Sequence, residues 1–367
     1  MKSSASMVVM MWSARRSDSV NALDLSGVKT ALPRYMDVVR GKRYPKYMIA
    51  QSIEAKYSRR DETETLWEKH DTLLETYNEI ETNIKRKPRK TQQSFLDLKI
   101  LLAHRIMQNC EFCERRCGSD RLHGDKGYCK AGRNFSLFSA FPHMGEEPEL
   151  VPSGTIFTGG CSIRCLHCQN WDISQWHSNG DNLTPERMAR QVADLTEKGC
   201  RNINMVGGDP TPYVWHWLET FNYVKKPIAT VWNSNSWYSH ETAKLLAGFI
   251  DLYLLDFKYG NNKCAEEVSD APEYWEAATR NHLMANKYGE LIIRVLVLPE
   301  HNECCTRPIL QWIHDNLGPD TRVNLMFQYR PEWHASKHPQ LNRKLSLTEK
   351  LDAKKMAEEI GLTNLVE

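Results

Sequence analysis

The chain has 367 residues, of which 41% are hydrophobic and 26% charged, a balance typical of a folded protein with one large domain or two medium ones. Its net charge of +2 gives no general argument for nucleic-acid binding, and it has no run of about 18–20 apolar residues that could cross a membrane. Eleven cysteines, an odd number in a chain without an export signal, argue against a disulfide framework and favour metal binding. We therefore expect a cytoplasmic protein.

Residues 1–105 predict a basic, mostly helical extension, since they hold 20 Lys and Arg against 13 Asp and Glu. Apolar residues recur at helical spacing before Pro88, which should end that helix, and residues 94–107 start another. The basic run at residues 85–90 predicts a solvated helix end, with a contact for an anionic partner as the alternative. Residues 1–16 predict a disordered or helical leader, with an organelle transit peptide as the alternative.

After residue 150 short apolar segments alternate with helical ones, a pattern typical of parallel βαβ units. Polar or Gly-rich residues follow nearly every apolar segment, so the carboxyl ends of the strands predict the functional face of either a barrel or a doubly wound sheet. The six predicted strands lie in residues 155–160, 202–208, 228–235, 249–260, 290–299 and 323–331.

Three cysteines lie within eight positions directly after the first of these strands: Cys161, Cys165 and Cys168. The spacing C-x3-C-x2-C differs from the paired cysteines of a zinc ribbon and from a C-x-x-C redox motif. Three thiolates from one loop can ligate three irons of a [4Fe–4S] cluster. The fourth iron would then be open, which by analogy with zinc sites indicates a catalytic centre.

The segment from "CEFCERRCGSDRLHGDKGYCKAG" to "GEEPELVPSGTIFTGGCSIRCLHCQNWDISQ" resembles the pyruvate formate-lyase activating enzyme-like branch of the radical S-adenosylmethionine (SAM) superfamily. More narrowly, it resembles the PflX-type iron–sulfur proteins. The resemblance covers about two-thirds of the chain. It implies a partial (β/α)6 TIM-like barrel in which the three cysteines hold a [4Fe–4S] cluster and SAM binds the open iron. An electron from the cluster would cleave SAM to a 5′-deoxyadenosyl radical, which abstracts hydrogen from the substrate.

The resemblance also implies a set of SAM contacts at the strand ends. His167 stands where the family often has an aromatic residue that touches adenine, with a surface imidazole as the alternative. Asp209 would meet the amino group of SAM, where the family more often has Glu. Arg294 lies within an apolar strand and therefore needs a partner, which the SAM carboxylate or Asp256 would supply. The remaining contacts have helix capping or a simple ion pair as alternatives. The full set is His167, Gly207, Gly208, Asp209, Asn233, Ser234, Asn235, Asp256, Lys258 and Arg294.

A second cysteine group, Cys110, Cys113, Cys117 and Cys129, has the spacing C-x2-C-x3-C-x11-C. It predicts a metal-binding loop that holds either a closed zinc site or an auxiliary iron–sulfur cluster. Basic residues nearby make a nucleic-acid contact conceivable, but no recognition helix is evident. The other cysteines predict small core residues, with a hydrogen-donor or extra-ligand role as the alternative for three of them. These three are Cys264, Cys304 and Cys305.

The sequence thus predicts an α/β radical SAM enzyme that abstracts hydrogen from a protein or peptide, with ferredoxin or flavodoxin as the electron donor. The alternatives are a radical SAM enzyme that modifies tRNA, and a non-enzymatic iron–sulfur or zinc scaffold. The predicted divisions are an N-terminal extension (1–105), a Cys-rich metal-binding segment (106–150), the barrel (151–335) and a C-terminal helix (336–367).

Overall fold

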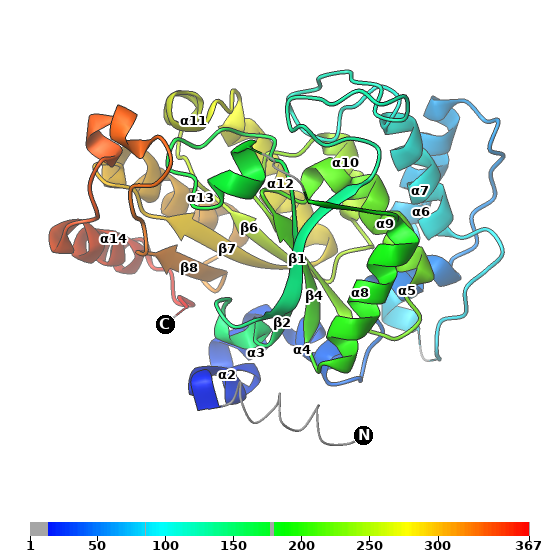
Figure 1. Cartoon of the computed structure of the whole chain (residues 1–367). Coiled ribbons are helices and arrows are strands. Elements are labelled where there is room, and N and C mark those ends of the chain that lie inside the picture. The colour runs from blue at the N-terminus through cyan, green and yellow to red at the C-terminus, as the bar shows by residue number, and fades with distance from the viewer. Residues whose placement is uncertain (1–13, 85, 177–179, 367) are drawn as a thin grey trace.

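The computed structural model describes residues 14–84, 86–176 and 180–366. The predicted leader, up to residue 13, and Lys85 of the basic run lie outside the described residues. The centre of the molecule is one eight-stranded sheet, in the order β3-β1-β2-β4-β5-β6-β7-β8 (Figure 1). Its strands are β1 (Phe135–His143), β2 (Ser153–Thr158), β3 (Asp181–Leu183), β4 (Asn202–Gly207), β5 (Ala229–Ser234), β6 (Leu252–Asp256), β7 (Glu290–Leu296) and β8 (Arg322–Met326).

Six of these strands, β2 and β4 to β8, run parallel and confirm the six that the apolar segments predicted. The sheet is not closed within the described residues, because β3 and β8 are its two edges. The prediction of six strands was incomplete, since β1 pairs antiparallel with both β2 and β3. Serines interrupt the apolar residues of β1, which therefore form no apolar run, and β3 has only three residues.

Helices connect the parallel strands, as the alternating pattern predicted. Thr184 caps the first of them by accepting a hydrogen bond from the backbone N–H of Arg187, the role for which threonine is favoured. The crossover from β6 to β7 contains two helices where one was predicted. The connecting helices are α8 (Pro185–Glu197), α9 (Val214–Tyr223), α10 (His240–Leu246), α11 (Asn262–Ser269), α12 (Tyr274–Tyr288) and α13 (Arg307–Leu317), and α14 (Leu347–Ile360) closes the chain.

The N-terminal region is helical, as predicted, and packs against the sheet and its helices. Tyr35 and Met36 join a buried cluster with Val231, Leu252 and Ile292 of the parallel strands. Of the two long helices, α6 ends shortly before Pro88, and α7 begins close to the predicted residue 94, as the sequence indicated. A capping box starts α7. The helices of this region are α2 (Ser17–Val20), α3 (Ser26–Ala31), α4 (Pro33–Val39), α5 (Lys46–Ser52), α6 (Thr63–Asn83) and α7 (Phe95–Ile106).

Short helical turns complete the described chain, and two of them are π-helical. None of the helices in the described ranges is both long enough and apolar enough to cross a membrane. The short elements are η1 (Ala22–Asp24), η2 (Pro148–Leu150), η3 (Asp172–Trp176), η4 (Thr211–Tyr213), η5 (Asn302–Thr306), η6 (Ala335–Lys337) and η7 (Pro339–Leu341), of which η3 and η5 are the π-helices.

Candidate active site

A cavity of about 380 Å³ lies at the carboxyl ends of the parallel strands. It brings together the cysteine triplet and nine of the ten predicted SAM contacts; only Asp209 is not part of its lining. A larger cavity of about 930 Å³, lined by residues of α7 and α9 among others, contains no cysteine. The predicted residues that line the smaller cavity are Cys161, Cys165, Cys168, His167, Gly207, Gly208, Asn233, Ser234, Asn235, Asp256, Lys258 and Arg294.

The cysteine loop leaves β2 and is held against the end of α11. The backbone N–H groups of Arg164 and Leu166 donate to the carbonyls of Ser269 (2.7 Å) and Val268 (2.9 Å). These two hydrogen bonds are backbone contacts, so they fix the loop whatever the side chains at these positions. The loop is therefore anchored between a strand and the helix that follows β6.

Each of the three sulfurs has a polar neighbour. The hydroxyl of Ser269 donates to the Sγ of Cys165 (2.9 Å), and the side-chain amide of Asn235 donates to the Sγ of Cys161 (3.6 Å). The Sγ of Cys168 lies 3.0 Å from the hydroxyl of Ser174. Hydrogen bonds to sulfur tune the potential of an iron–sulfur cluster, so these donors suit the group that the triplet would hold.

The chemistry of the donor set fits a cluster. Burial raises the pKa of the Cys161 thiol well above its usual range, and it also raises the pKa of Cys165. Without a metal these thiols are therefore protonated, and a bound cation would replace their protons. Three soft thiolates on one loop at a cavity wall are the ligands that iron–sulfur clusters use.

His167 is buried, with 5% of its surface exposed, so the alternative of a surface imidazole is wrong. Burial, with a smaller effect of Lys258, lowers its pKa to about 3, and the ring is neutral at physiological pH. Its Nδ1 has no partner, and its ring centroid lies 5.6 Å from that of Tyr329. A neutral aromatic ring with a free polar atom faces the cavity.

Gly207 and Gly208 let the end of β4 approach the neighbouring backbone. Gly207 has a φ of +143°, and a Cβ added there would lie 2.0 Å from the carbonyl oxygen of Thr158. A Cβ on Gly208 would lie 2.2 Å from the carbonyl oxygen of Gly160. Only glycine fits at both positions, as the sequence predicted for a close backbone approach.

Asp209 lies behind the cavity wall rather than in it. Its carboxylate accepts hydrogen bonds from the Ser234 hydroxyl (2.9 Å) and from the backbone N–H groups of Asn235 (3.1 Å) and Thr211 (3.3 Å). Burial raises its pKa, although these donors partly offset the effect. In this arrangement the carboxylate joins β4 to the end of β5, and its contact with a SAM amino group stays a prediction.

Asp256 and Lys258 form an ion pair of 2.8 Å in the lining of the cavity. Burial by itself would lower the pKa of Lys258, but Asp256, with smaller contributions from Cys165 and Tyr274, outweighs that effect and raises the pKa, so the lysine stays protonated. Both side chains line the cavity. The predicted Asp–x–Lys element therefore exists as a pair whose charges can reach a ligand.

Arg294 pairs with two glutamates that the sequence did not single out. Its guanidinium donates to Glu147 (2.7 and 2.6 Å) and to Glu146, and it lies 3.5 Å from the Oδ1 of Asn233. The pKa of Arg294 is well above its usual range because the two carboxylates outweigh its burial. Two adjacent acidic residues close to a buried strand, in "GEEPEL", were the available signal.

The four-cysteine loop lies between α7 and β1. Within this loop, a hydrogen bond with Cys110 lowers the pKa of the Cys117 thiol to about 4. The Nη1 of Arg121 lies 3.9 Å from the Sγ of Cys110. That arginine is fully buried, and Arg115 stacks on Tyr128 with 4.0 Å between guanidinium and ring centroid. Both basic side chains face the protein and so are poor candidates for a nucleic-acid contact.

Comparisons with known proteins agree with this geometry. The profile of the radical SAM superfamily matches residues 155–313, which include the cysteine triplet and the other residues of the predicted set. The chain contains a domain of the radical SAM superfamily over these residues. Membership implies a [4Fe–4S] cluster and SAM, and the cavity supplies the residue types that both require.

Two uncharacterised proteins of Methanocaldococcus jannaschii are similar to this radical SAM chain. MJ0674 is 39% identical over 344 residues, which cover 90% of this chain and 98% of MJ0674. MJ0808 is 25% identical over 253 residues, which cover 63% of this chain and 73% of MJ0808.

Two solved structures resemble the radical SAM chain at low identity. Streptococcus suis SuiB bound to the precursor peptide SuiA has a TM-score of 0.44 and 12% identity, over 82% of this chain and 61% of SuiB. TYW1 with a lysine–pyruvate adduct has a TM-score of 0.38 and 15% identity, over 56% of this chain and 73% of TYW1.

Proposed function

We propose that this protein reductively cleaves SAM at a [4Fe–4S] cluster held by Cys161, Cys165 and Cys168, and abstracts hydrogen from a protein or peptide. One observation carries the proposal: three buried or half-buried thiols share a cavity with polar side chains from the ends of consecutive parallel strands. When bound, the cluster and SAM supply a 5′-deoxyadenosyl radical that takes a hydrogen atom from the substrate.

The residues around the thiols would bind SAM and exclude water. In this proposal Arg294 and Lys258 provide positive charge for the SAM carboxylate, although each also has an acidic partner. The neutral ring of His167 would contact adenine, and Asn233 with Asn235 would contact the ribose. The burial of these groups strengthens each electrostatic contact because few water molecules compete for it.

A polypeptide is the substrate class that we favour. The sheet is open between its edges in the described residues, so the cavity is not enclosed by a complete ring of strands. Phe141 of β1 is 40% exposed and stacks on Phe157, which lines the cavity, with ring centroids 5.8 Å apart. An exposed aromatic side chain beside the cavity suits contact with a protein partner.

We further propose that the protein belongs to the pyruvate formate-lyase activating enzyme-like branch and its PflX-type members, on the motifs that carry that resemblance. It would act in the cytoplasm, with ferredoxin or flavodoxin as the electron donor.

For the second metal we favour an auxiliary iron–sulfur cluster on the four-cysteine loop. Thiolates around one zinc ion would lie about 3.8 Å apart, and the described loop does not gather three sulfurs within 4.8 Å of one another.

The first experiment measures SAM cleavage. Anaerobically reconstituted protein is reduced with dithionite and mixed with SAM, and 5′-deoxyadenosine is quantified by liquid chromatography and mass spectrometry. We expect product from the wild type and from Cys200→Ala, a buried cysteine outside both groups, and none from Cys161→Ala. Product from Cys161→Ala would overturn the cluster assignment, and no product from the wild type would favour the non-enzymatic scaffold.

The second experiment tests the substrate class. Extract from the source cells is added to the same reaction, with and without prior protease or RNase treatment. We expect the extract to increase the yield of 5′-deoxyadenosine, and we expect protease to remove that increase while RNase leaves it unchanged. Loss of the increase on RNase treatment would overturn the polypeptide proposal in favour of RNA modification.

A further inference from the structure

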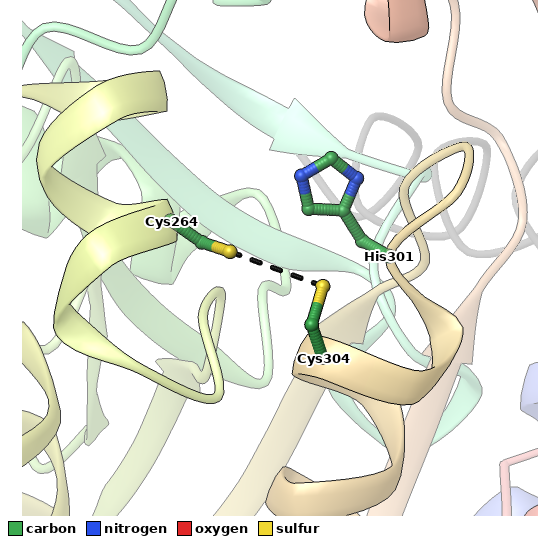
Figure 2. A group of neighbouring side chains, drawn as sticks. All are labelled: Cys264, His301 and Cys304. Carbon is green, nitrogen blue, oxygen red and sulfur yellow. Dashed lines mark hydrogen bonds between the residues drawn. The ribbon is translucent and has the colours of Figure 1, made fainter.

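A third group of candidate metal ligands lies apart from both cysteine groups described above. Cys264 lies in the first turn of α11, which follows β6, whereas His301 and Cys304 lie in the segment that follows β7. Their candidate ligand atoms all lie within 4.8 Å of one another, and Figure 2 shows the three side chains together.

The spacing of the two sulfurs is that of two ligands on one ion. The Sγ atoms of Cys264 and Cys304 are 3.9 Å apart. A disulfide would require about 2.0 Å, whereas two thiolates on a tetrahedral zinc ion, each at about 2.3 Å from the metal, lie about 3.8 Å apart. The sulfurs therefore need little movement to bind a common ion.

The imidazole of His301 is held in the form that binds metal. Its Nδ1 lies 2.6 Å from the carbonyl oxygen of Pro299. Because a carbonyl oxygen can only accept, Nδ1 carries the proton and Nε2 keeps its lone pair. A hydrogen bond from the second ring nitrogen to a backbone carbonyl is the usual support for a metal-bound histidine. His301 is also buried, with 5% exposure.

Other contacts hold the two segments together at this point. The side-chain amide of Asn261 donates to the carbonyl of Cys304 (2.8 Å) and to the Sγ of Cys264 (3.4 Å). A Cβ on Gly260 would lie 2.7 Å from the carbonyl oxygen of Cys305, so a larger residue could not approach so closely. The cluster is thus built by two segments that the fold keeps in close contact.

We propose that Cys264, His301 and Cys304 bind a zinc ion. Two thiolates and an imidazole select a borderline or soft metal such as zinc over magnesium or calcium, and the two thiolates would balance the charge of Zn²⁺. Cys304 is exposed, so the ion has access from solvent and water completes the coordination. Cys305 lies beside the three ligands, with its Sγ 3.9 Å from that of Cys304 and a side-chain hydrogen bond with Cys264.

The site would stabilise the helix that holds the predicted cluster loop. The ion binds the first turn of α11, and Val268 and Ser269 in the last turn of the same helix contact the loop of Cys165. A bound zinc ion would therefore tie α11 to the segment after β7 without taking part in the chemistry. This proposal does not depend on SAM cleavage.

The test counts metal on the intact chain. Zinc and iron are measured by mass spectrometry of anaerobically purified wild type, Cys264→Ser, Cys304→Ser and the control Cys200→Ser. We expect each of the first two variants to hold one zinc ion per chain fewer than the wild type, and the control to match the wild type. Zinc-edge X-ray absorption of the wild type, which requires no variant to fold, should show nitrogen and sulfur neighbours.

Two results would overturn the zinc site. One is an unchanged zinc content in both variants, with or without a loss of iron. The other is a disulfide between Cys264 and Cys304 in freshly purified wild type, detected by thiol alkylation and peptide mass spectrometry. The zinc count uses no SAM, so its failure is separate from any failure of the proposed enzymatic function.

Discussion

The two ends of the parallel sheet both carry buried charge, but they use it differently. At the amino ends, Asp251 is fully buried and accepts hydrogen bonds from Arg34, from the backbone of Lys46 (2.9 Å) and from Thr230. Arg34 also pairs with Glu81. These charges are matched by partners from the N-terminal helices, and none of these residues lines the candidate active site.

At the carboxyl ends, the ion pairs of Arg294 with Glu146 and of Lys258 with Asp256 line the cavity of the candidate active site. The same strand, β6, has Asp251 just before its start and Asp256 at its end. Charged groups that are buried away from any cavity can act only on the fold. Charged groups that line a cavity can also bind a ligand in place of their partner in the protein. We therefore expect changes at the amino ends to affect stability, and changes at the carboxyl ends to affect ligand binding.

The largest effect is expected from Asp251→Ala. The change leaves Arg34 with one acidic partner fewer in a buried site, so we expect the free energy of unfolding to fall by about 3–5 kcal/mol. Urea denaturation measures the loss, and SAM cleavage per folded molecule should not change. The exposed Asp352→Ala is the control. A loss below about 1 kcal/mol would contradict the structural role of the amino-end charges.

Lys258→Met should have the opposite effects, a small loss of stability and a large loss of SAM cleavage. Asp256 lines the cavity and can be rehydrated there, so we expect a loss of stability of only about 1 kcal/mol. SAM cleavage should fall more than about tenfold, because a cation in the proposed SAM site is removed. Lys198→Met removes the lysine of an exposed ion pair of the same length, 2.8 Å, and should leave SAM cleavage unchanged. Equal activity in both variants would argue against a ligand at the carboxyl-end charges.

The smallest effect concerns pH and His167. Its pKa in the folded state is about 3, below the usual 6.5, so the unfolded chain binds a proton first and stability is lost as the pH falls below 6.5. Between pH 7.5 and 5.5 this residue should account for a loss of about 1.4 kcal/mol. His167→Phe should reduce the acid-induced loss of stability by that amount, measured by urea denaturation at both pH values.

The control for this prediction is His123→Phe. The side chain of His123 is 79% exposed, so this change should leave the pH dependence as it is in the wild type. An equal effect of the two variants would mean that the buried ring at the cavity is protonated as readily as an exposed one. The assignment of His167 as a neutral ring facing the ligand would then be wrong.

The sequence by itself determined the six parallel strands, the helices between them except α11, and the cysteine triplet at the end of the first strand. These features depend on neighbours along the chain: an apolar run, a capping residue, or three thiols within eight positions. It also indicated which end of the sheet carries the site, because parallel strands all end on the same side.

Only the tertiary structure decided which side chains meet across that end. Arg294 pairs with Glu146 and Glu147, which lie almost 150 residues away in the chain, and Asp209 faces the end of β5 instead of the cavity. Cys264 and Cys304 are 40 residues apart in sequence yet 3.9 Å apart in space. Such contacts depend on strand order and on the packing of loops, which local periodicity does not contain.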